Sequence, residues 1–276
     1  MNSKTDTTAF RPKKRLGQHF LTDPGVIREI IAQGEFGRKD EILEIGPGRG
    51  ALTLPLAGMV GRMFAVEKDT QLVEILQKGL SKAGDSNVIL INQDILKFDF
   101  GDLPQPSTGK IQVVGNLPYN ISSPLIERLI MHRNLFGRAL LMFQMELAER
   151  LLALPGHREY GAITVALRYY ASVSPVLRVS RDAFYPRPKV DSMVLKLDFE
   201  DPHPRRADDE THFRRVVKEA FAHKRKTLAN SLRAGMKARS GAEILEALER
   251  CNIDPRKRAE ALDIDDFISL SAALAR

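Results

Sequence analysis

The chain has 276 residues, of which 43% are hydrophobic and 28% are charged. That composition fits a folded protein with a sizeable core, and it excludes both a disordered chain and a membrane-spanning one. Lysine and arginine number 42 against 35 aspartates and glutamates, and the net charge of +7 suits a polyanionic partner such as nucleic acid. The single Cys251 excludes an intramolecular disulfide and a multi-cysteine zinc site, and it indicates a reducing, cytoplasmic compartment.

Residues 1–12 are expected to form a flexible tail, because Met1–Phe10 is polar and lacks the apolar segment of a signal peptide. Beyond the tail, short apolar runs alternate with helical stretches. The apolar runs are typical of buried parallel strands, and they are Ile42–Ile45, Met63–Val66, Val88–Ile91, Gln112–Val114 and Ala139–Phe143. The helical stretches are Thr70–Leu80, Ser123–Met131 and Glu146–Leu154. This alternation predicts a right-handed, doubly wound α/β sheet.

The sequence also predicts the start of the helix over Ser123–Met131 and the last strands of the sheet. Ser123 is expected to cap that helix, with Pro124 as its first residue. The late apolar runs Val176–Val179 and Ser192–Leu197 are close together, so we expect an antiparallel pair at one edge of the sheet.

The segment 201–210 combines prolines with charges and has no apolar period, so we expect a linker there. The chain beyond it has a helical pattern in three or four pieces, with breaks near Arg239–Gly241 and at Asp254-Pro255. We therefore predict an α/β domain over residues 13–204 and a small all-α domain over residues 205–276.

A glycine-rich turn, Glu44-Ile-Gly-Pro-Gly-Arg-Gly50, follows the first predicted strand and precedes a predicted helix over Ala51–Ala57. Alternating glycines allow backbone N–H groups to approach a ligand closely. Glu67 ends the next strand, 21 positions after Gly46, which is the usual spacing for a carboxylate that binds a ribose. Asp94 follows the third strand, so both acids are expected at the ligand-binding edge of the sheet. The turn indicates a nucleoside cofactor, and its glycine spacing also matches a nicotinamide-dinucleotide site.

The tetrapeptide Asn116-Leu117-Pro118-Tyr119 follows the fourth predicted strand, at the same edge. The exocyclic amine of adenine is a poor nucleophile, because its lone pair is delocalised into the ring. Two carbonyl oxygens, one from Asn116 and one held rigid by the following proline, would favour a pyramidal nitrogen and orient its lone pair toward an electrophile. Tyr119 would stack on a base flipped out of its helix or loop. These residues favour group transfer to an adenine amine without a strong general base.

The glycine-rich turn, the two acids and the Asn-Leu-Pro-Tyr tetrapeptide together resemble the S-adenosylmethionine-dependent ribosomal RNA adenine N6-dimethyltransferases. Three further segments share this resemblance, namely Leu16–Leu21, Phe184–Ser192 and Phe221–Leu228. The resemblance runs from about residue 13 to beyond residue 230. Asn116–Leu125 is most similar to the branch that modifies two adjacent adenines near the 3′ end of small-subunit (16S) rRNA. The resemblance implies a Rossmann-like sheet, S-adenosylmethionine as the cofactor, no metal, and a role in small-subunit biogenesis.

The resemblance also implies roles for individual residues. In it, Glu67 contacts the cofactor ribose and Asp94 the cofactor adenine, while Tyr119 and Phe184 lie on either side of the target adenine. The implied cofactor-binding residues are His19, Leu21, Gly46, Gly48, Glu67, Asp94 and Asn116. The implied catalytic residues are Asn116, Leu117, Pro118, Tyr119 and Phe184. His19 departs from the asparagine of many members, which makes its assignment the weakest of the set.

Basic clusters are expected to hold RNA by neutralising its phosphates, and they are Arg11–Arg15, Arg205–Arg206, His223–Lys226 and Arg256–Arg258. The expected partner is small-subunit rRNA within a 30S subunit or an assembly intermediate, bound by a monomeric protein without a membrane. Two alternatives within RNA biology are a non-catalytic ribosome-assembly factor and a large-subunit rRNA adenine methylase. A nicotinamide-dependent oxidoreductase is a third, but it leaves Asn116, Tyr119 and the basic clusters unexplained.

Overall fold

The computed structural model describes residues 12–13, 16–106 and 109–275. The tail predicted over residues 1–12 therefore lies almost entirely outside the described residues. Contacts divide the chain into two compact units, one of Met1–Gln144 with Val176–Leu195 and one of Met145–Pro175 with Lys196–Arg276. The domain boundary near residue 205 stays a prediction.

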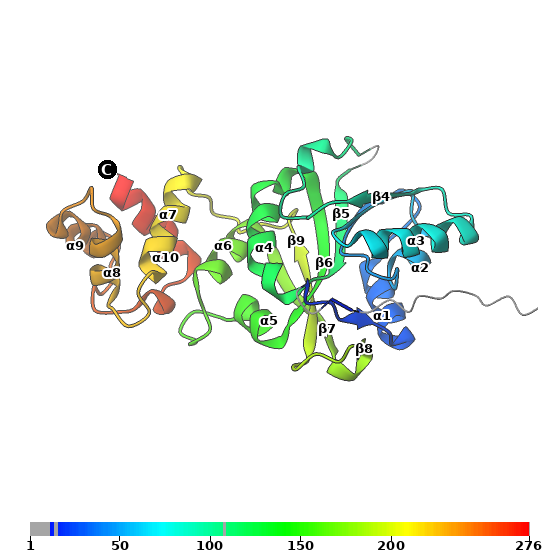
Figure 1. Ribbon diagram of the computed structural model, residues 1–276. Helices are drawn as coiled ribbons and strands as arrows, with labels where there is room; N and C mark the ends of the chain where they lie inside the picture. The colour runs from blue at the N-terminus through cyan, green and yellow to red at the C-terminus, as the bar shows by residue number, and fades with distance from the viewer. Residues whose placement is uncertain (1–11, 14–15, 107–108, 276) are drawn as a thin grey trace, which may run out of the picture. The chain divides into compact units, whose positions relative to one another are not determined.

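Seven strands form one sheet in the order β4-β3-β2-β5-β6-β9-β7 (Figure 1). The strands are β2 (Glu41–Ile45), β3 (Arg62–Glu67), β4 (Val88–Asn92), β5 (Ile111–Asn116), β6 (Phe136–Gln144), β7 (Ser172–Val179) and β9 (Ser192–Asp198). The five from β2 to β6 pair in parallel, which confirms the five predicted strands. Four of them are buried as predicted, but β4 is not, because it is the edge strand and Ile89 is 45% exposed. The late strands β9 and β7 are neighbours, with β7 at the edge as expected.

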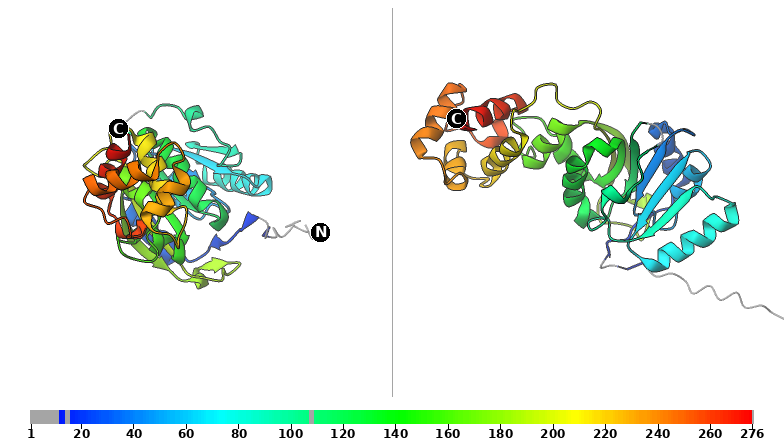
Figure 2. Two further views of the ribbon diagram at one scale, coloured as in Figure 1. Left: turned by 90° about the vertical axis from the view of Figure 1, so that its left-hand side faces the viewer. Right: turned by 90° about the horizontal axis from the view of Figure 1, so that it is seen from above.

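The helices of the first unit connect these strands. They are α1 (Pro24–Gly34), α2 (Thr53–Ala57), α3 (Thr70–Ala83) and α4 (Ser122–Met131), with 3₁₀ turns η2 (Phe100–Asp102), η3 (Tyr119–Ile121), η4 (Arg133–Leu135) and η5 (Arg181–Ala183). Residues of α1, α2 and α3 share one apolar cluster with strand residues such as Ile42 and Met63, so these helices cover one face of the sheet (Figure 2).

The predicted start of α4 is wrong by two residues. The helix begins at Ser122, and the residue before it, Ile121, has helical backbone angles and provides no side-chain cap. The turn η3 leads directly into α4, so Ser123 is already inside the helix and cannot cap it. Pro124 is the third helical residue, still within the first turn, where a missing N–H costs no intrahelical hydrogen bond.

The second unit contains α5 (Met145–Leu152), α6 (Ala162–Tyr170), α7 (Glu210–Phe221), α8 (Leu228–Gly235), the 3₁₀ turn η6 (Ala259–Ala261), α9 (Gly241–Arg250) and α10 (Ile264–Ala275). The four helices after residue 209 confirm the predicted helical C-terminal region and its breaks. Residues 201–209 of the predicted linker have neither helix nor strand, and Glu210 begins α7. Arg206 of the linker lies 3.9 Å from the Tyr169 ring and donates to the Tyr169 carbonyl at 2.7 Å. No helix in the described part of the chain is long and apolar enough to cross a membrane.

The strand order reverses between β2 and β5. The chain runs from β2 to β3 and β4 on one side of the sheet and returns to β5 on the other side. Loops that follow β2 and β5 therefore diverge, and open α/β sheets bind ligands in the crevice outside such a reversal. Gly115 allows the two strands to approach there, because a Cβ at this position would lie 2.7 Å from the Ile45 carbonyl oxygen.

Candidate active site

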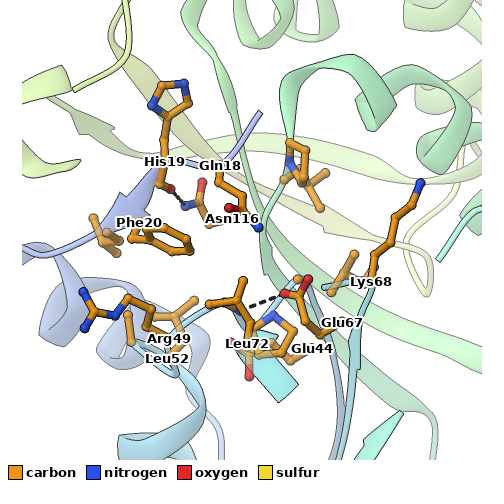
Figure 3. A pocket seen from close by; sticks show the side chains of 18 of the residues that line it. Gln18, His19, Phe20, Glu44, Arg49, Leu52, Glu67, Lys68, Leu72 and Asn116 are labelled. Carbon is orange, nitrogen blue, oxygen red and sulfur yellow. Dashed lines mark hydrogen bonds between the residues drawn. The ribbon is translucent and has the colours of Figure 1, made fainter. Parts of the chain in front are cut away.

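A cavity of about 550 Å³ opens at this crevice (Figure 3). Its volume is in the range of small-molecule and cofactor sites. Its walls come from the segment before α1, the glycine turn after β2, the ends of β3 and β4, and the residues after β5. It is lined by ten of the predicted site residues, which are His19, Leu21, Gly46, Gly48, Glu67, Asp94, Asn116, Leu117, Pro118 and Tyr119. The eleventh, Phe184, does not line it.

The glycine turn forms one wall of the cavity. Gly46, Gly48 and Gly50 all have positive φ, of 69°, 57° and 85°, which L-residues with side chains rarely adopt. A Cβ on Gly48 would also lie 3.1 Å from the ring of Phe20. The turn therefore keeps its backbone bare beside the cavity, and a cofactor that needs close backbone approach fits this wall.

Glu67 lies at the end of β3 with only 8% of its surface exposed. One carboxylate oxygen accepts the backbone N–H of Gly48 at 3.1 Å, and the other accepts that of Asp69 at 2.8 Å. Burial raises the pKa of Glu67, and these two hydrogen bonds oppose that shift. Because a carboxylate offers about four lone-pair sites, the fixed group retains acceptor capacity for ribose hydroxyls.

Asp69 fastens the N-terminal segment over the cavity, a role that our sequence analysis missed. Its fully buried carboxylate accepts hydrogen bonds from Lys13 Nζ at 2.6 Å and from Gln18 Nε2 at 2.9 Å. Burial alone would raise the pKa of Asp69, but these bonds hold it below its usual range. Within the predicted basic cluster Arg11–Arg15, Lys13 thus pairs with a carboxylate, while Arg11 and residues 14–15 lie outside the described residues.

Asp94 is held from two sides at the mouth of the cavity. Its carboxylate accepts from Lys68 Nζ at 2.8 Å and from the Leu96 backbone N–H at 3.0 Å. Burial would raise the pKa of Asp94, but the hydrogen bond from Lys68 outweighs it together with the other contacts, and the net shift is downward. Arg128 of α4 secures the same loop, since it donates to the Leu96 carbonyl at 2.8 Å and to the Phe98 carbonyl. Asp94 is therefore a positioned, ionised acceptor.

The side chain of Asn116 has a defined orientation at the end of β5. Its amide nitrogen donates to the backbone carbonyl of His19 at 2.9 Å (Figure 3). This bond uses one of the two N–H donors of the amide and fixes the orientation of the group, so the oxygen Oδ1 remains to accept hydrogen bonds from a ligand. Asn116 is thus suited to accept an N–H bond from a target amine.

His19 contacts the tetrapeptide through its ring as well as through its backbone. Its ring stacks on that of Tyr119, with centroids 5.6 Å apart and planes 24° apart. Its Nδ1 lies 2.7 Å from the carbonyl oxygen of Pro186, so Nδ1 carries the proton and donates. Figure 3 shows the ring directed away from Glu44 and Glu67. The side chain therefore supports Tyr119.

Tyr119 is fixed from a second direction by Ser192 at the start of β9. The two hydroxyl oxygens are 3.4 Å apart, and Ser192 is fully buried. Burial raises the pKa of Tyr119, with partial opposition from Ser192, so the phenol stays neutral near pH 7. A neutral ring held at both ends is suited to stack on a base.

Phe184 does not line the cavity, and its place beside the target adenine stays a prediction. Phe184 belongs to β8 (Phe184–Tyr185), which pairs with β1 (Phe20–Leu21) so that Phe184 lies opposite Leu21. This pairing turns the Phe184 ring into the apolar core, where it is 4% exposed. Tyr119 is therefore the aromatic ring of the predicted pair that borders the cavity.

Glu44 is a cavity residue to which our sequence analysis assigned no role. It lies on β2 with 2% of its surface exposed, and its Oε2 has no hydrogen-bond partner among the described residues. Burial raises the pKa of Glu44 to about 7; the neighbouring Thr53 hydroxyl opposes this shift, and the charge of Glu67 adds to it. The signal available in the sequence was an acid within the otherwise apolar run Ile42–Ile45.

The raised pKa of Glu44 predicts a pH-dependent stability. The folded chain binds this proton more tightly than the unfolded chain, in which the pKa is near 4.5, so the free energy of unfolding falls as pH rises from 4.5 to about 7. The loss should total about 3 kcal/mol. Glu44→Gln cannot titrate and avoids this loss, so we expect its free energy of unfolding relative to wild type to rise by about 3 kcal/mol between pH 4.5 and pH 8. Urea denaturation of the cofactor-free chain measures this difference. An equal difference at both pH values would contradict this assignment.

The fold and the cavity together define a class of protein. A parallel sheet with a glycine turn after its first strand, acids after the next two and Asn-Leu-Pro-Tyr after the fourth is the framework of an S-adenosylmethionine-dependent methyltransferase of Rossmann-like fold. The sequence model of ribosomal RNA adenine dimethylase matches residues 9–276. The chain belongs to the ribosomal RNA adenine dimethylase family, which confirms the predicted family, enzyme class and cofactor.

Individual relatives cover nearly the whole chain. Ribosomal RNA small subunit methyltransferase A of Desulforapulum autotrophicum is 43% identical over 265 residues, which are 95% of this chain and 92% of the relative. The protein of the same name from Geobacter sulfurreducens is 44% identical over 267 residues, 96% of each chain. The structure of a dimethyladenosine transferase from Plasmodium falciparum has a TM-score of 0.76 at 30% identity and covers 91% of this chain and 96% of that one. The structure of the 23S rRNA methyltransferase ErmE has a TM-score of 0.68 at 23% identity and covers 93% of this chain and 100% of that one. This likeness supports the fold alone.

Proposed function

We propose that this chain transfers methyl groups from S-adenosylmethionine to N6 of two adjacent adenines near the 3′ end of small-subunit (16S) rRNA, giving N6,N6-dimethyladenosines. Its substrate is the rRNA of a 30S subunit or of an assembly intermediate, and it acts as a cytoplasmic monomer. The observation that carries the proposal is the orientation of Asn116, whose amide nitrogen is bound by the His19 carbonyl and whose oxygen is left to accept. Two relatives named for the small subunit, at 43% and 44% identity, favour this branch.

We assign the cofactor to the wall formed by the glycine turn and the two acids. Gly46 and Gly48 admit the methionine part to bare backbone, Glu67 accepts the ribose hydroxyls, and Asp94 accepts the adenine amine. His19 and Leu21 close the cavity from the N-terminal segment. When bound, S-adenosylmethionine supplies a methyl group on a sulfonium, which is the electrophile of the reaction.

The tetrapeptide prepares the target amine. Asn116 Oδ1 and the Leu117 carbonyl, held by Pro118, accept the two N–H bonds and favour a pyramidal nitrogen with its lone pair toward the methyl group. Tyr119 stacks on the flipped base. The amine proton becomes acidic only after the new C–N bond forms, so water removes it and no strong base is required.

A cationic surface in the second unit suits the RNA partner. The backbone N–H of Leu228 donates to the Lys257 carbonyl at 2.7 Å, which brings the exposed runs His223–Lys226 and Arg256–Arg258 side by side. Two ion pairs offset part of their charge, Arg256–Asp254 at 3.2 Å and Arg258–Glu260 at 3.9 Å. The remaining positive charge is complementary to rRNA phosphates.

Binding to small subunits should weaken steeply as the salt concentration rises, because each neutralised phosphate releases counterions. The double variant Lys224→Ala/Lys226→Ala should lower the slope of log affinity against log salt by about 1.5. Lys78→Ala, which removes an exposed lysine from α3, should leave the slope unchanged. Filter binding at several salt concentrations measures both, and a flat response in the wild type would show that the surface does not hold RNA.

The proposed substrate is tested by incubating the purified chain with labelled S-adenosylmethionine and ribosomal subunits that lack the modification. We expect label in small-subunit rRNA and none in large-subunit rRNA. Label in the large subunit alone would favour the large-subunit branch. Binding to small subunits without any label would favour a non-catalytic assembly factor.

A further inference from the structure

Tyr185 presents an open aromatic face on the surface of the first unit. It is 64% exposed, the highest fraction among the exposed large hydrophobic side chains of the described residues. In the pair of β1 with β8, Tyr185 lies opposite Phe20, one position after the buried Phe184. Successive side chains of a strand point to opposite faces, so the pairing that buries Phe184 directs Tyr185 outward.

The backbone just after Tyr185 contacts the site that we assign to the target base. The residue after it, Pro186, accepts a hydrogen bond from His19 at 2.7 Å. The His19 ring in turn stacks on Tyr119 at 5.6 Å. Tyr185 therefore directly precedes Pro186, whose carbonyl binds the His19 ring that stacks on Tyr119. Pro186 and the buried Pro188 restrict the backbone that follows Tyr185.

The surface around Tyr185 carries charges of both signs with a positive excess. Its exposed cations are Arg181, Arg187 and Lys189, and its exposed acids are Asp182 and Asp191. Asp182 pairs with Arg187 at 2.9 Å, and Asp191 accepts the backbone N–H of Arg181 at 3.0 Å. Lys189 is exposed four residues after Tyr185. An aromatic ring beside surface cations is the combination on which proteins stack unpaired bases next to a bound phosphate backbone.

We propose that Tyr185 stacks on the base of the nucleotide adjoining the target adenine, while Lys189 lies along the backbone of the same strand. This role rests on the proposed function and extends it from the flipped base to its neighbour. It gives the enzyme a second base contact outside the cavity. A tyrosine in a paired strand that leads into a proline-restricted segment loses little conformational entropy on binding, so the contact contributes efficiently to the capture of the RNA strand.

The first test compares variants on unmethylated small subunits. Tyr185→Ala should lower kcat/KM for the subunits by about tenfold, the scale of one lost base–aromatic stack. Tyr185→Trp should retain activity, because stacking needs a ring and no hydroxyl. Val190→Ala, at a 43% exposed position on the same loop, should match the wild type. The affinity for S-adenosylmethionine and the melting temperature should be unchanged in all three, which separates lost stacking from a damaged fold.

The second test locates the contact. In subunits reconstituted with an abasic nucleotide beside the target adenine, the wild type and Tyr185→Ala should have equal kcat/KM, since the stacking partner is gone. A tenfold difference that persists on the abasic substrate would overturn the proposed contact, as would equal activities on the intact substrate. A wild type that methylates no small subunit would overturn the proposed function itself, whereas an active wild type with an equally active Tyr185→Ala would overturn only the role of Tyr185.

Discussion

Replacing Asn116 by alanine lowers the turnover of small-subunit methylation by about 10²- to 10³-fold, the scale for removing one preorganised polar group from an active site. The variant loses the Oδ1 acceptor for the target amine, and it also releases the His19 carbonyl that the wild-type amide binds at 2.9 Å. Single-turnover methylation with saturating cofactor measures the effect on the chemical step.

The control for this experiment is Asn134→Ala, which removes an exposed asparagine in the turn η4, away from the cavity. It should methylate at the wild-type rate. Asn116→Ala should still bind small subunits, because the proposed RNA-binding surface, His223–Lys226 with Arg256–Arg258, does not include this residue. Near-wild-type methylation by Asn116→Ala would contradict the assigned role of the tetrapeptide.

Replacing Glu67 by glutamine weakens the binding of S-adenosylmethionine by about 10- to 100-fold, the range for losing charge-assisted hydrogen bonds. The wild-type carboxylate accepts from Gly48 and Asp69 with one oxygen each. A glutamine amide must turn its NH₂ group toward one of these backbone donors, so it loses that bond as well as the negative charge.

Titration calorimetry with S-adenosylmethionine measures this loss directly. Glu74→Gln, which changes an exposed carboxyl on α3 in the same way, should bind the cofactor as tightly as the wild type. The affinity of Glu67→Gln for small subunits should stay within about twofold of the wild type, since the phosphate contacts are unchanged. Unchanged cofactor affinity in Glu67→Gln would remove this residue from the site.

Most of the sheet could be predicted from the sequence because its strands are buried on both faces. The run Met63–Val66 is apolar without alternation, and Ile42–Ile45 is interrupted only by Glu44, which is typical of parallel strands covered by helices. The cavity was predictable for a related reason. Motifs that end parallel strands meet at one edge of the sheet, and the residues after β2, β3 and β5 line one cavity there.

Other features depend on contacts between distant segments, which local patterns do not encode. The burial of Phe184 and the exposure of Tyr185 follow from the pairing of β8 with β1, more than 160 positions away in the chain. The clamp between Asp69 and Lys13 spans 56 positions, and Asp69 alone resembles an ordinary helix cap. The juxtaposition of two basic runs likewise depends on the bond between Leu228 and Lys257.

The pKa of Glu44 could not be predicted, because it depends on the complete burial of the carboxyl. In the sequence, Glu44 is one acid in a glycine motif. In the fold, burial raises its pKa to about 7 and leaves Oε2 without a partner among the described residues. Only the packing of β2 within the sheet determines that environment.

The most direct test of the central claim is to identify the product nucleoside and its position. Small-subunit rRNA methylated by the purified chain is digested and analysed by mass spectrometry, and the modified bases are mapped. We predict N6,N6-dimethyladenosine at two adjacent adenines near the 3′ end of 16S rRNA, and none when Asn116→Ala is assayed over the same short interval. Methylation at any atom other than adenine N6, or no methylated adenine in the small-subunit rRNA, would contradict the proposed function.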